Sequence, residues 1–178
     1  MKKTLMLAVL ACLLIAAPAS AKSGFYLGVN MLFNDISGEI NSPEVLDAGN
    51  GLGLRAGFGL NRYLALEGAI WKTEHDRTGG GSTDLKAGTL DLKLNLPLSG
   101  SNIEPYVLVG FGRYTLETGS ASVNGTGTQF GIGMDIYLFP ELSFNAGLTR
   151  RNITFDTPGT DEDGKVTSLD FGFTYHFI

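Results

Sequence analysis

Large apolar side chains alternate with small or polar ones along most of this chain. The alternation is clearest at the C-terminal end, where apolar side chains occupy every second position from Leu169 to Phe177. Side chains two residues apart lie on the same face of a β-strand, so this segment predicts a strand with one apolar face. An apolar face at the end of the chain favours a strand that faces lipid and pairs with another strand, because an exposed apolar edge in water recruits other chains.

The same alternation recurs in seven earlier segments. Their apolar faces extend over Phe25–Phe33, Leu52–Leu60, Leu64–Ile70, Leu90–Leu96, Tyr106–Tyr114, Phe130–Leu138 and Leu142–Leu148. Most of these faces cover about eight residues, which at a tilt near 40° spans an apolar band of ~25 Å once side-chain reach is added. The chain therefore predicts eight strands of the length that crosses the apolar part of a membrane.

The fifth segment is ambiguous in phase. We read Tyr106, Leu108 and Tyr114 as its outward face, which would place the two tyrosines near the two membrane interfaces, together with Phe25 and Phe33. The opposite face carries Val107, Val109 and Phe111, so the reversed phase stays open.

Connections of two lengths alternate between the segments. Short ones are expected at residues 61–63, 97–105 and 139–141, and long polar ones at 34–50, 73–84, 117–127 and 152–165. Outer-membrane barrels have short periplasmic turns and longer extracellular loops. The fold class is therefore predicted as all-β, an eight-stranded antiparallel up-and-down transmembrane β-barrel, with both termini periplasmic and the long loops extracellular.

The first 21 residues have the pattern of a secretory signal peptide. Lys2 and Lys3 precede the apolar stretch Leu5–Ala16, and Ala19-Ser20-Ala21 is a small-residue cleavage site. We therefore expect residues 1–21 to be cleaved and residues 22–178 to form the barrel domain. Cys12, the single cysteine, allows a lipoprotein as an alternative, but the apolar stretch continues past it.

The mature chain would be acidic and free of thiols. Removing Lys2 and Lys3 from the 13 basic residues leaves 11 against 18 acidic ones, a net charge of −7. This balance argues against a nucleic-acid partner, which needs a basic face. Without a cysteine the mature chain has no disulfide, no thiolate nucleophile and no cysteine metal site.

Three local sequences carry a resemblance to a known family. They are Leu60–Glu67, Pro105–Gly112 and the closing Gly172–Phe177. With them the chain resembles the small eight-stranded outer-membrane barrels of the OmpX and OmpA-transmembrane-domain type, a porin-like superfamily. The chain departs from that pattern by ending in Ile178, one residue beyond the aromatic Phe177.

The resemblance implies a place in the outer membrane of a Gram-negative bacterium. It also implies that the barrel-assembly machinery recognises the C-terminal strand through Gly172, Phe173, Tyr175 and Phe177. The implied protein is a monomer with no enzymatic activity and no cofactor.

Charged side chains fall on the predicted inner face of the strands. The expected lumen network comprises Arg55, Glu67, Asp91, Lys93, Arg113, Asp135, Arg151, Asp170 and His176. Its four cations balance its four carboxylates, as confined charges require. Inward glycines, including Gly57 and Gly133, would make room for these side chains. The network is interpreted as a sealed plug, with a narrow or gated ion path as the alternative.

Three candidate chemical sites are weighed and set aside. His176 and Ser143 both point inward and could meet as base and nucleophile, but no third group is evident to orient the histidine. His75 is expected to be solvated in a loop. Asp161-Glu162-Asp163-Gly164 lacks the full spacing of a calcium loop and is expected to be a solvated turn. We therefore predict no catalytic, cofactor or metal site.

Four basic residues are expected near the extracellular rim. Lys72, Lys86, Arg150 and Lys165 could contact lipopolysaccharide phosphates or simply extend their charges from the edge of the membrane into water. The partners expected are outer-membrane lipid, lipopolysaccharide and the assembly machinery. The expected role is structural or surface-exposed; the alternatives are a small porin or gated channel, and an adhesin-like protein that binds through its loops.

Overall fold

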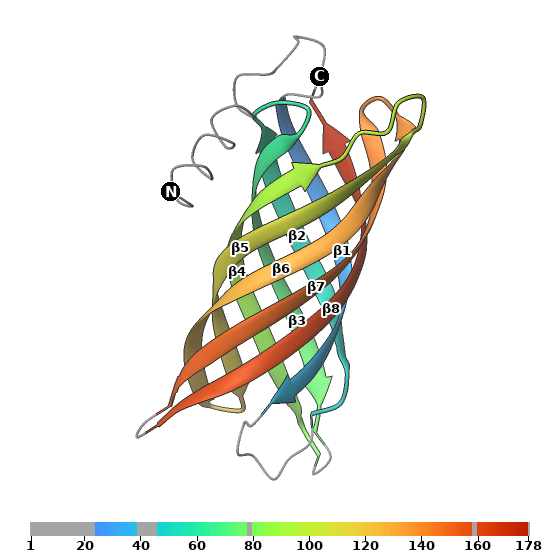
Figure 1. The fold of residues 1–178 in the computed structure, drawn as a ribbon. Coiled ribbons are helices and arrows are strands. Elements are labelled where there is room, and N and C mark those ends of the chain that lie inside the picture. The colour runs from blue at the N-terminus through green and yellow to red at the C-terminus, as the bar shows by residue number, and fades with distance from the viewer. Residues whose placement is uncertain (1–23, 39–45, 78–79, 158–159, 178) are drawn as a thin grey trace, which may run out of the picture.

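A computed structural model of the chain describes residues 24–38, 46–77, 80–157 and 160–177. Figure 1 shows them as a closed barrel of strongly tilted strands. The strands are β1 (Gly24–Gly38), β2 (Gly49–Gly59), β3 (Leu64–Asp76), β4 (Ser82–Asn95), β5 (Ile103–Thr118), β6 (Ala121–Phe139), β7 (Leu142–Thr157) and β8 (Thr160–His176). The predicted signal peptide, residues 1–21, lies outside the described residues and stays a prediction.

Each strand pairs antiparallel with its neighbours in the chain, and β8 closes the barrel on β1. Tyr26 pairs with His176 and Asn34 with Ser168 along this closing seam. The predicted fold class, an eight-stranded up-and-down barrel, is confirmed. No helix among the described residues is long and apolar enough to cross a membrane.

The strand registers fix the tilt of the barrel. Following paired residues around the wall from Leu27 returns to β1 at Ser37, ten residues farther along. At ~3.3 Å per residue and ~4.8 Å between strands, that is a slide of ~33 Å over a width of ~38 Å, or a tilt of about 41°. Each residue then rises ~2.5 Å along the barrel axis.

The outward face of seven strands follows the predicted phase. On β1 the outward side chains from Phe25 to Phe33 are 42–55% exposed, and Tyr26, Asn30 and Leu32 between them are buried. The nine residues from Phe25 to Phe33 rise ~20 Å, which with side-chain reach gives the ~25 Å of an outer-membrane barrel. We call the ring of outward apolar side chains the apolar band. Leu64 is an exception to the predicted exposure, because it is buried.

The predicted phase of β5 is wrong. Tyr106 and Tyr114 are buried inside the barrel, and Val109 and Phe111 are 56% and 62% exposed. Tyr106 pairs with Gly133 of β6, and its ring occupies the space that a Cβ on that glycine would take. The inward glycine thus provides the room that the aromatic ring needs.

The four long connections are shorter than predicted. β5 and β6 are joined by Gly119 and Ser120 alone, and Gly119 has the positive φ of 58° that favours glycine in a tight turn. Residues 152–165, expected as a loop, fall mostly in β7 and β8, which continue to Thr157 and start again at Thr160. The strands extend beyond the apolar band, and their outward side chains there are polar.

Candidate functional site: the barrel interior and its distal rim

The barrel has two unlike ends. We call the end where β1 begins and β8 ends the terminal end, and the opposite end the distal end. The connections 60–63 and 140–141 lie at the terminal end, and residues 119–120 at the distal end. The interior has a polar part on the terminal side and an apolar part on the distal side.

Charged side chains fill the terminal part of the interior. Arg55 Nη2 contacts Asp170 Oδ1 at 2.8 Å, and Arg55 Nη1 lies 3.8 Å from Glu67 Oε1. Asn30 joins the group, since it accepts from Arg55 Nε at 2.7 Å and donates to Asp170 at 2.8 Å. Tyr26 donates to Glu67 at 2.9 Å. Arg55 pairs with Ala69 on β3, and Glu67 is the diagonal neighbour on the same face.

A second charged pair lies nearer the terminal end. Lys93 Nζ contacts Asp135 Oδ2 at 2.6 Å, and both residues are buried. The ammonium also lies 4.0 Å from the centre of the Tyr106 ring, within cation–π range. The reversed phase of β5 supplies this ring, which the sequence interpretation placed outside.

Arg151 and Asp91 belong to a third group. Arg151 Nε donates to Gln129 at 2.9 Å, and Gln129 Nε2 donates to Asp91 Oδ1 at 2.5 Å. Thr89 donates to the other carboxylate oxygen of Asp91 at 3.0 Å. Asp91 thus accepts from two neutral donors, and none of the ion pairs in the described part of the chain involves it.

The predicted charge balance is not kept, because Arg113 points outward. Its side chain is exposed on the outer face of β5, two residues beyond Phe111. Glu104, on the inward face of β5, is buried and was missed by the sequence interpretation. Of the predicted network, Arg55, Lys93 and Arg151 remain inside with four carboxylates, so the interior is acidic rather than neutral.

Ser143 and His176 meet, as the sequence allowed. Ser143 Oγ lies 3.1 Å from His176 Nε2, and the histidine ring packs against the rings of Tyr26 and Tyr137 at 5.5 and 5.3 Å. Ser143 has no exposed surface. A serine without access to substrate cannot act as a nucleophile, so the pair is a packing and hydrogen-bonding contact.

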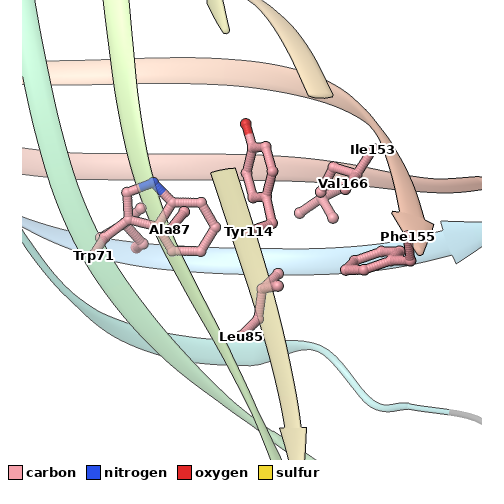
Figure 2. Packing of buried hydrophobic residues seen from close by; sticks show 8 residues of the cluster. Trp71, Leu85, Ala87, Tyr114, Ile153, Phe155 and Val166 are labelled. Carbon is pink, nitrogen blue, oxygen red and sulfur yellow. The ribbon is translucent and has the colours of Figure 1, made fainter. Parts of the chain in front are cut away.

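An apolar cluster fills the distal part of the interior. We call it the distal core, and Figure 2 shows its side chains converging from several strands. It comprises Leu32, Trp71, Leu85, Ala87, Tyr114, Ile153, Phe155 and Val166. Leu85 has no exposed surface, and Ile153, Val166 and Tyr114 have 1% each. A soluble barrel has this arrangement, with apolar residues inside and polar ones outside.

The strands reverse their polarity between the two parts. On β7 the inward residues change from Ser143 and Thr149 to Ile153 and Phe155, while the outward residues change from Leu148 to polar ones. Within the membrane the apolar face of a strand points outward to lipid, and beyond the membrane it points inward to the distal core. In both places the apolar face is turned away from water. The sequence interpretation missed the distal core. It assigned the distal ends of the strands to loops, because their outward residues are polar.

His75 is buried, and the prediction that it is solvated in a loop is wrong. It lies on the inward face of β3 beyond Lys72 and has no exposed surface. Its Nδ1 lies 3.0 Å from the carbonyl oxygen of Asp47, and its Nε2 lies 3.1 Å from Thr73 Oγ1. Since a carbonyl only accepts, Nδ1 carries the proton and ties residue 47 to β3.

Two small cavities interrupt the interior packing. A cavity of about 50 Å³ lies between Arg55, Asp91, Arg151 and Trp71, and one of about 20 Å³ lies near Lys93 and the terminal end. The larger has room for roughly three or four water molecules. Among the described residues no group of His, Cys, Asp and Glu could hold a metal ion. Asp161–Gly164 lies within β8, so the expectation that this segment is a solvated turn is wrong.

Five basic side chains lie on the outer faces of β3, β4, β5, β7 and β8, beyond the distal edge of the apolar band. We call them the cationic belt: Lys72, Lys86, Arg113, Arg150 and Lys165. Each follows the apolar stretch of its strand on the distal side, as Lys72 follows Ile70. Four were predicted near the rim, and the fifth, Arg113, is added by the reversed phase of β5.

Solved structures with the same fold are small outer-membrane barrels. Neisserial surface protein A is 18% identical, with a TM-score of 0.63 over 87% of this chain and 98% of that one. OprG of Pseudomonas aeruginosa is 18% identical, with a TM-score of 0.60 over 88% and 97%. Ail, the attachment invasion locus protein of Yersinia pestis, is 16% identical, with a TM-score of 0.58 over 87% and 99%. At these identities the likeness concerns the fold.

No curated protein matches the sequence. The model of the outer membrane protein beta-barrel domain matches residues 4–177, nearly the whole chain. This family agrees with the closed eight-stranded wall, the apolar band and the resemblance noted from the sequence. The chain therefore belongs to the outer membrane protein beta-barrel family and is a transmembrane barrel of the bacterial outer membrane.

Proposed function

We propose that the protein is a monomeric, non-conducting barrel whose role is structural or exerted at its distal surface. The observation that carries this proposal is the distal core. Its side chains pack across the lumen between the charged network and the distal end, and Leu85, Ile153 and Val166 leave almost no surface to water. A hydrated ion entering this layer would lose water ligands without gaining polar partners, which is costly.

The charged network adds a second barrier. Arg55 and Lys93 are each held by carboxylates at 2.8 and 2.6 Å, and both side chains are buried. Eight strands leave interior space only for side chains. The network then holds the wall rigid rather than lining a path.

Planar-bilayer recording of the purified, folded protein tests the closed lumen. We expect no discrete conductance steps above the background of the lipid alone. Glu67→Gln is the variant recorded beside the unmodified protein, because Glu67 lines the larger of the two interior cavities and the substitution removes its charge. Steps in the unmodified protein whose cation selectivity falls in Glu67→Gln would overturn the proposal and favour a narrow channel.

We also propose that the distal end faces the outside of the cell and the terminal end faces the periplasm. The part beyond the cationic belt supports this orientation, since about six residues of β6 and β7 project there, or ~15 Å. Ser120 lies at the distal turn and Ser99 in a terminal-end connection, and both are exposed. On intact cells an impermeant maleimide should label Ser120→Cys and not Ser99→Cys; the reverse would refute the orientation.

The outward aromatic side chains at the C-terminal end of the chain are the basis for proposing that the assembly machinery recognises this segment. Phe173, Tyr175 and Phe177 are about half exposed, and Phe177 packs against Phe25 of β1 at 5.9 Å. Gly172, which directly precedes Phe173, faces inward. We expect Phe177→Ala to slow insertion into vesicles that carry the assembly machinery and to leave spontaneous insertion into plain vesicles nearly unchanged. Equal slowing in both would assign Phe177 to barrel closure alone.

A second candidate function is binding at the distal surface. The strands project beyond the apolar band with polar outward faces, which include Asn124 and Thr126 of β6 and Asp156 of β7. A structural neighbour, Ail, is described as an attachment invasion protein. Surface binding by cells that carry the protein, lost in Asn124→Ala with Asp156→Ala while the barrel still folds, would favour this role over a purely structural one.

A further inference from the structure

Two grooves run along the outer wall of the barrel, one on each side of a ridge formed by Leu54 and Ile70. The larger has a volume of about 1230 Å³ and extends across the outer wall from β1 to β7, with polar residues of β6 and β7, such as Thr128 and Asn152, in its lining. The smaller has a volume of about 880 Å³ and reaches toward β1 and β8, where Phe171 and Phe173 line it. Small-molecule sites typically measure about 300–1,000 Å³, so the two together suit a large apolar ligand.

Two outward glycines deepen the larger groove. A Cβ on Gly88 would meet no atom within 4 Å, and one on Gly68 would meet its nearest atom at 3.8 Å. Neither glycine has a positive φ. Interior packing and backbone conformation therefore explain neither residue, in contrast to Gly57, whose missing Cβ makes room for Tyr26. What the two glycines provide is depth on the lipid-facing side.

Three cations of the belt close the distal ends of the grooves. Lys72 and Lys86 line the smaller groove and Arg113 the larger. Lys72 and Lys86 are direct cross-strand partners, and Arg113 pairs with Gly88, two residues from Lys86 on the same face. Neighbouring positions of this kind lie about 5–8 Å apart, where like charges repel each other.

Two of these three cations have acidic partners, and the third has no ion pair among the described residues. Lys72 contacts Asp84 and Lys86 contacts Glu117, each at 2.6 Å. Both acids are farther toward the distal end on their strands. None of the ion pairs among the described residues includes Arg113. An anion at the edge of the apolar band would therefore meet the unpaired charge of Arg113 and two lysines whose acidic partners lie on their distal side.

We infer that this wall holds one lipopolysaccharide molecule by its phosphorylated, polyacylated lipid A. The acyl chains lie in the grooves on both sides of the Leu54–Ile70 ridge, and the phosphates lie against Lys72, Lys86 and Arg113. Two grooves under three cations fit several acyl chains and more than one phosphate better than the two chains and single phosphate of a phospholipid. The inference rests on the proposed orientation, in which the distal end lies in the outer leaflet.

Native mass spectrometry of the folded protein in detergent tests the site directly. The probes are bis-phosphorylated lipid A, the same lipid without phosphates, and phosphatidylglycerol. We expect a one-to-one complex with the first. Its population should fall about tenfold to thirtyfold in Lys86→Gln with Arg113→Gln, because each basic residue at an anionic surface contributes about 1 kcal/mol. Gly68→Leu with Gly88→Leu should weaken it by filling the larger groove.

Matched controls lie elsewhere on the same wall. Arg150→Gln with Lys165→Gln removes two belt cations that line neither groove, and Ala146→Leu enlarges an outward small residue of β7. Both controls should keep the complex within about twofold, since the charges and depth under the lipid are unchanged. A gel-mobility shift on heating verifies that every variant is folded.

Several outcomes would overturn the inference. If the test variant and the control variant of the cationic belt lost the lipid A complex equally, the binding would be a general attraction by the belt and not a site at the grooves. Equal binding of the dephosphorylated lipid or of phosphatidylglycerol would remove lipopolysaccharide as the occupant, and a dimer that disappears in Gly68→Leu with Gly88→Leu would assign the groove to a second copy. A conducting lumen or a reversed labelling pattern would refute the proposed function while leaving this in vitro binding result standing.

Discussion

Replacing Arg55 by methionine should destabilise the barrel far more than the same change at Arg113. Arg55 is 9% exposed, donates to Asn30 and Asp170 at 2.7 and 2.8 Å, and lies 3.8 Å from Glu67. Methionine keeps much of the apolar volume of the side chain but leaves Asp170 and Glu67 inside without this cation. Each carboxylate then keeps a neutral donor, Asn30 for Asp170 and Tyr26 for Glu67.

The expected cost follows from these contacts. Removing one partner of a buried ion pair costs about 3–5 kcal/mol, because the remaining charge stays buried without compensation. We expect Arg55→Met to lower the free energy of unfolding by that amount, which is roughly two to three and a half powers of ten in the equilibrium constant. Arg113→Met removes an exposed charge without an ion pair among the described residues, so its cost should stay below about 1 kcal/mol.

The assay is reversible urea unfolding from phosphatidylcholine vesicles. Trp71 is the single tryptophan of the chain, and it lies in the distal core, where Arg151 lies over its ring at 4.8 Å. Its fluorescence therefore reports the loss of the distal core on unfolding, and the folded-state signal of each variant is recorded as its own baseline. Equal costs at Arg55 and Arg113 would refute both the reversed phase of β5 and the assignment of Arg55 to the buried network.

Two further predictions concern packing inside the wall. Gly57→Val should cost about 1–3 kcal/mol, because the new side chain collides with the ring of Tyr26, whereas Gly88→Val, in open space, should cost well under that; urea unfolding compares the two, and equal costs would contradict the packing argument. Leu85→Ala should cost about 2–5 kcal/mol as a cavity in the distal core. Leu66→Ala, on the lipid-facing surface, should cost less by the same measurement, and the opposite order would argue against a packed distal core.

The outward phase of seven strands could be predicted because one face of each is apolar without interruption. The outward phase of β5 was predicted wrongly, because the two faces of this strand are nearly equal in hydrophobicity. Tyr106 and Tyr114 stand on one face, and Val109 and Phe111 on the other. The phase is decided by the neighbours, because Gly133 lies directly across from Tyr106 and leaves room for its ring. A cross-strand pairing of this kind follows from the register, which alternation within one strand does not reveal.

The candidate site was predicted only in part, because contacts between distant strands cannot be read from alternation within one strand. Arg55 and Glu67 could be placed together, since Leu60 and Leu64 bracket a short turn and Leu60 N–H donates to the Leu64 carbonyl at 2.8 Å. Partners on distant strands, such as Lys93 and Asp135, depend on the tilt and diameter of the closed barrel. Arg113 was lost from the network with the phase of β5.

The polarity reversal explains why the long loops were predicted too long. It also provides a sequence pattern by which such strand ends can be distinguished from loops. In β8 the inward residues change from Asp170 and Ser168 to Val166, while the outward residues change from Leu169 to Lys165. A period of two continues through this change, and only the apolar phase is inverted. A loop has no reason to keep that period, so an inverted alternation beyond a basic residue indicates a strand leaving the membrane. The basic residue marks the boundary itself, because a cation at that height meets anionic headgroups on one side and water on the other.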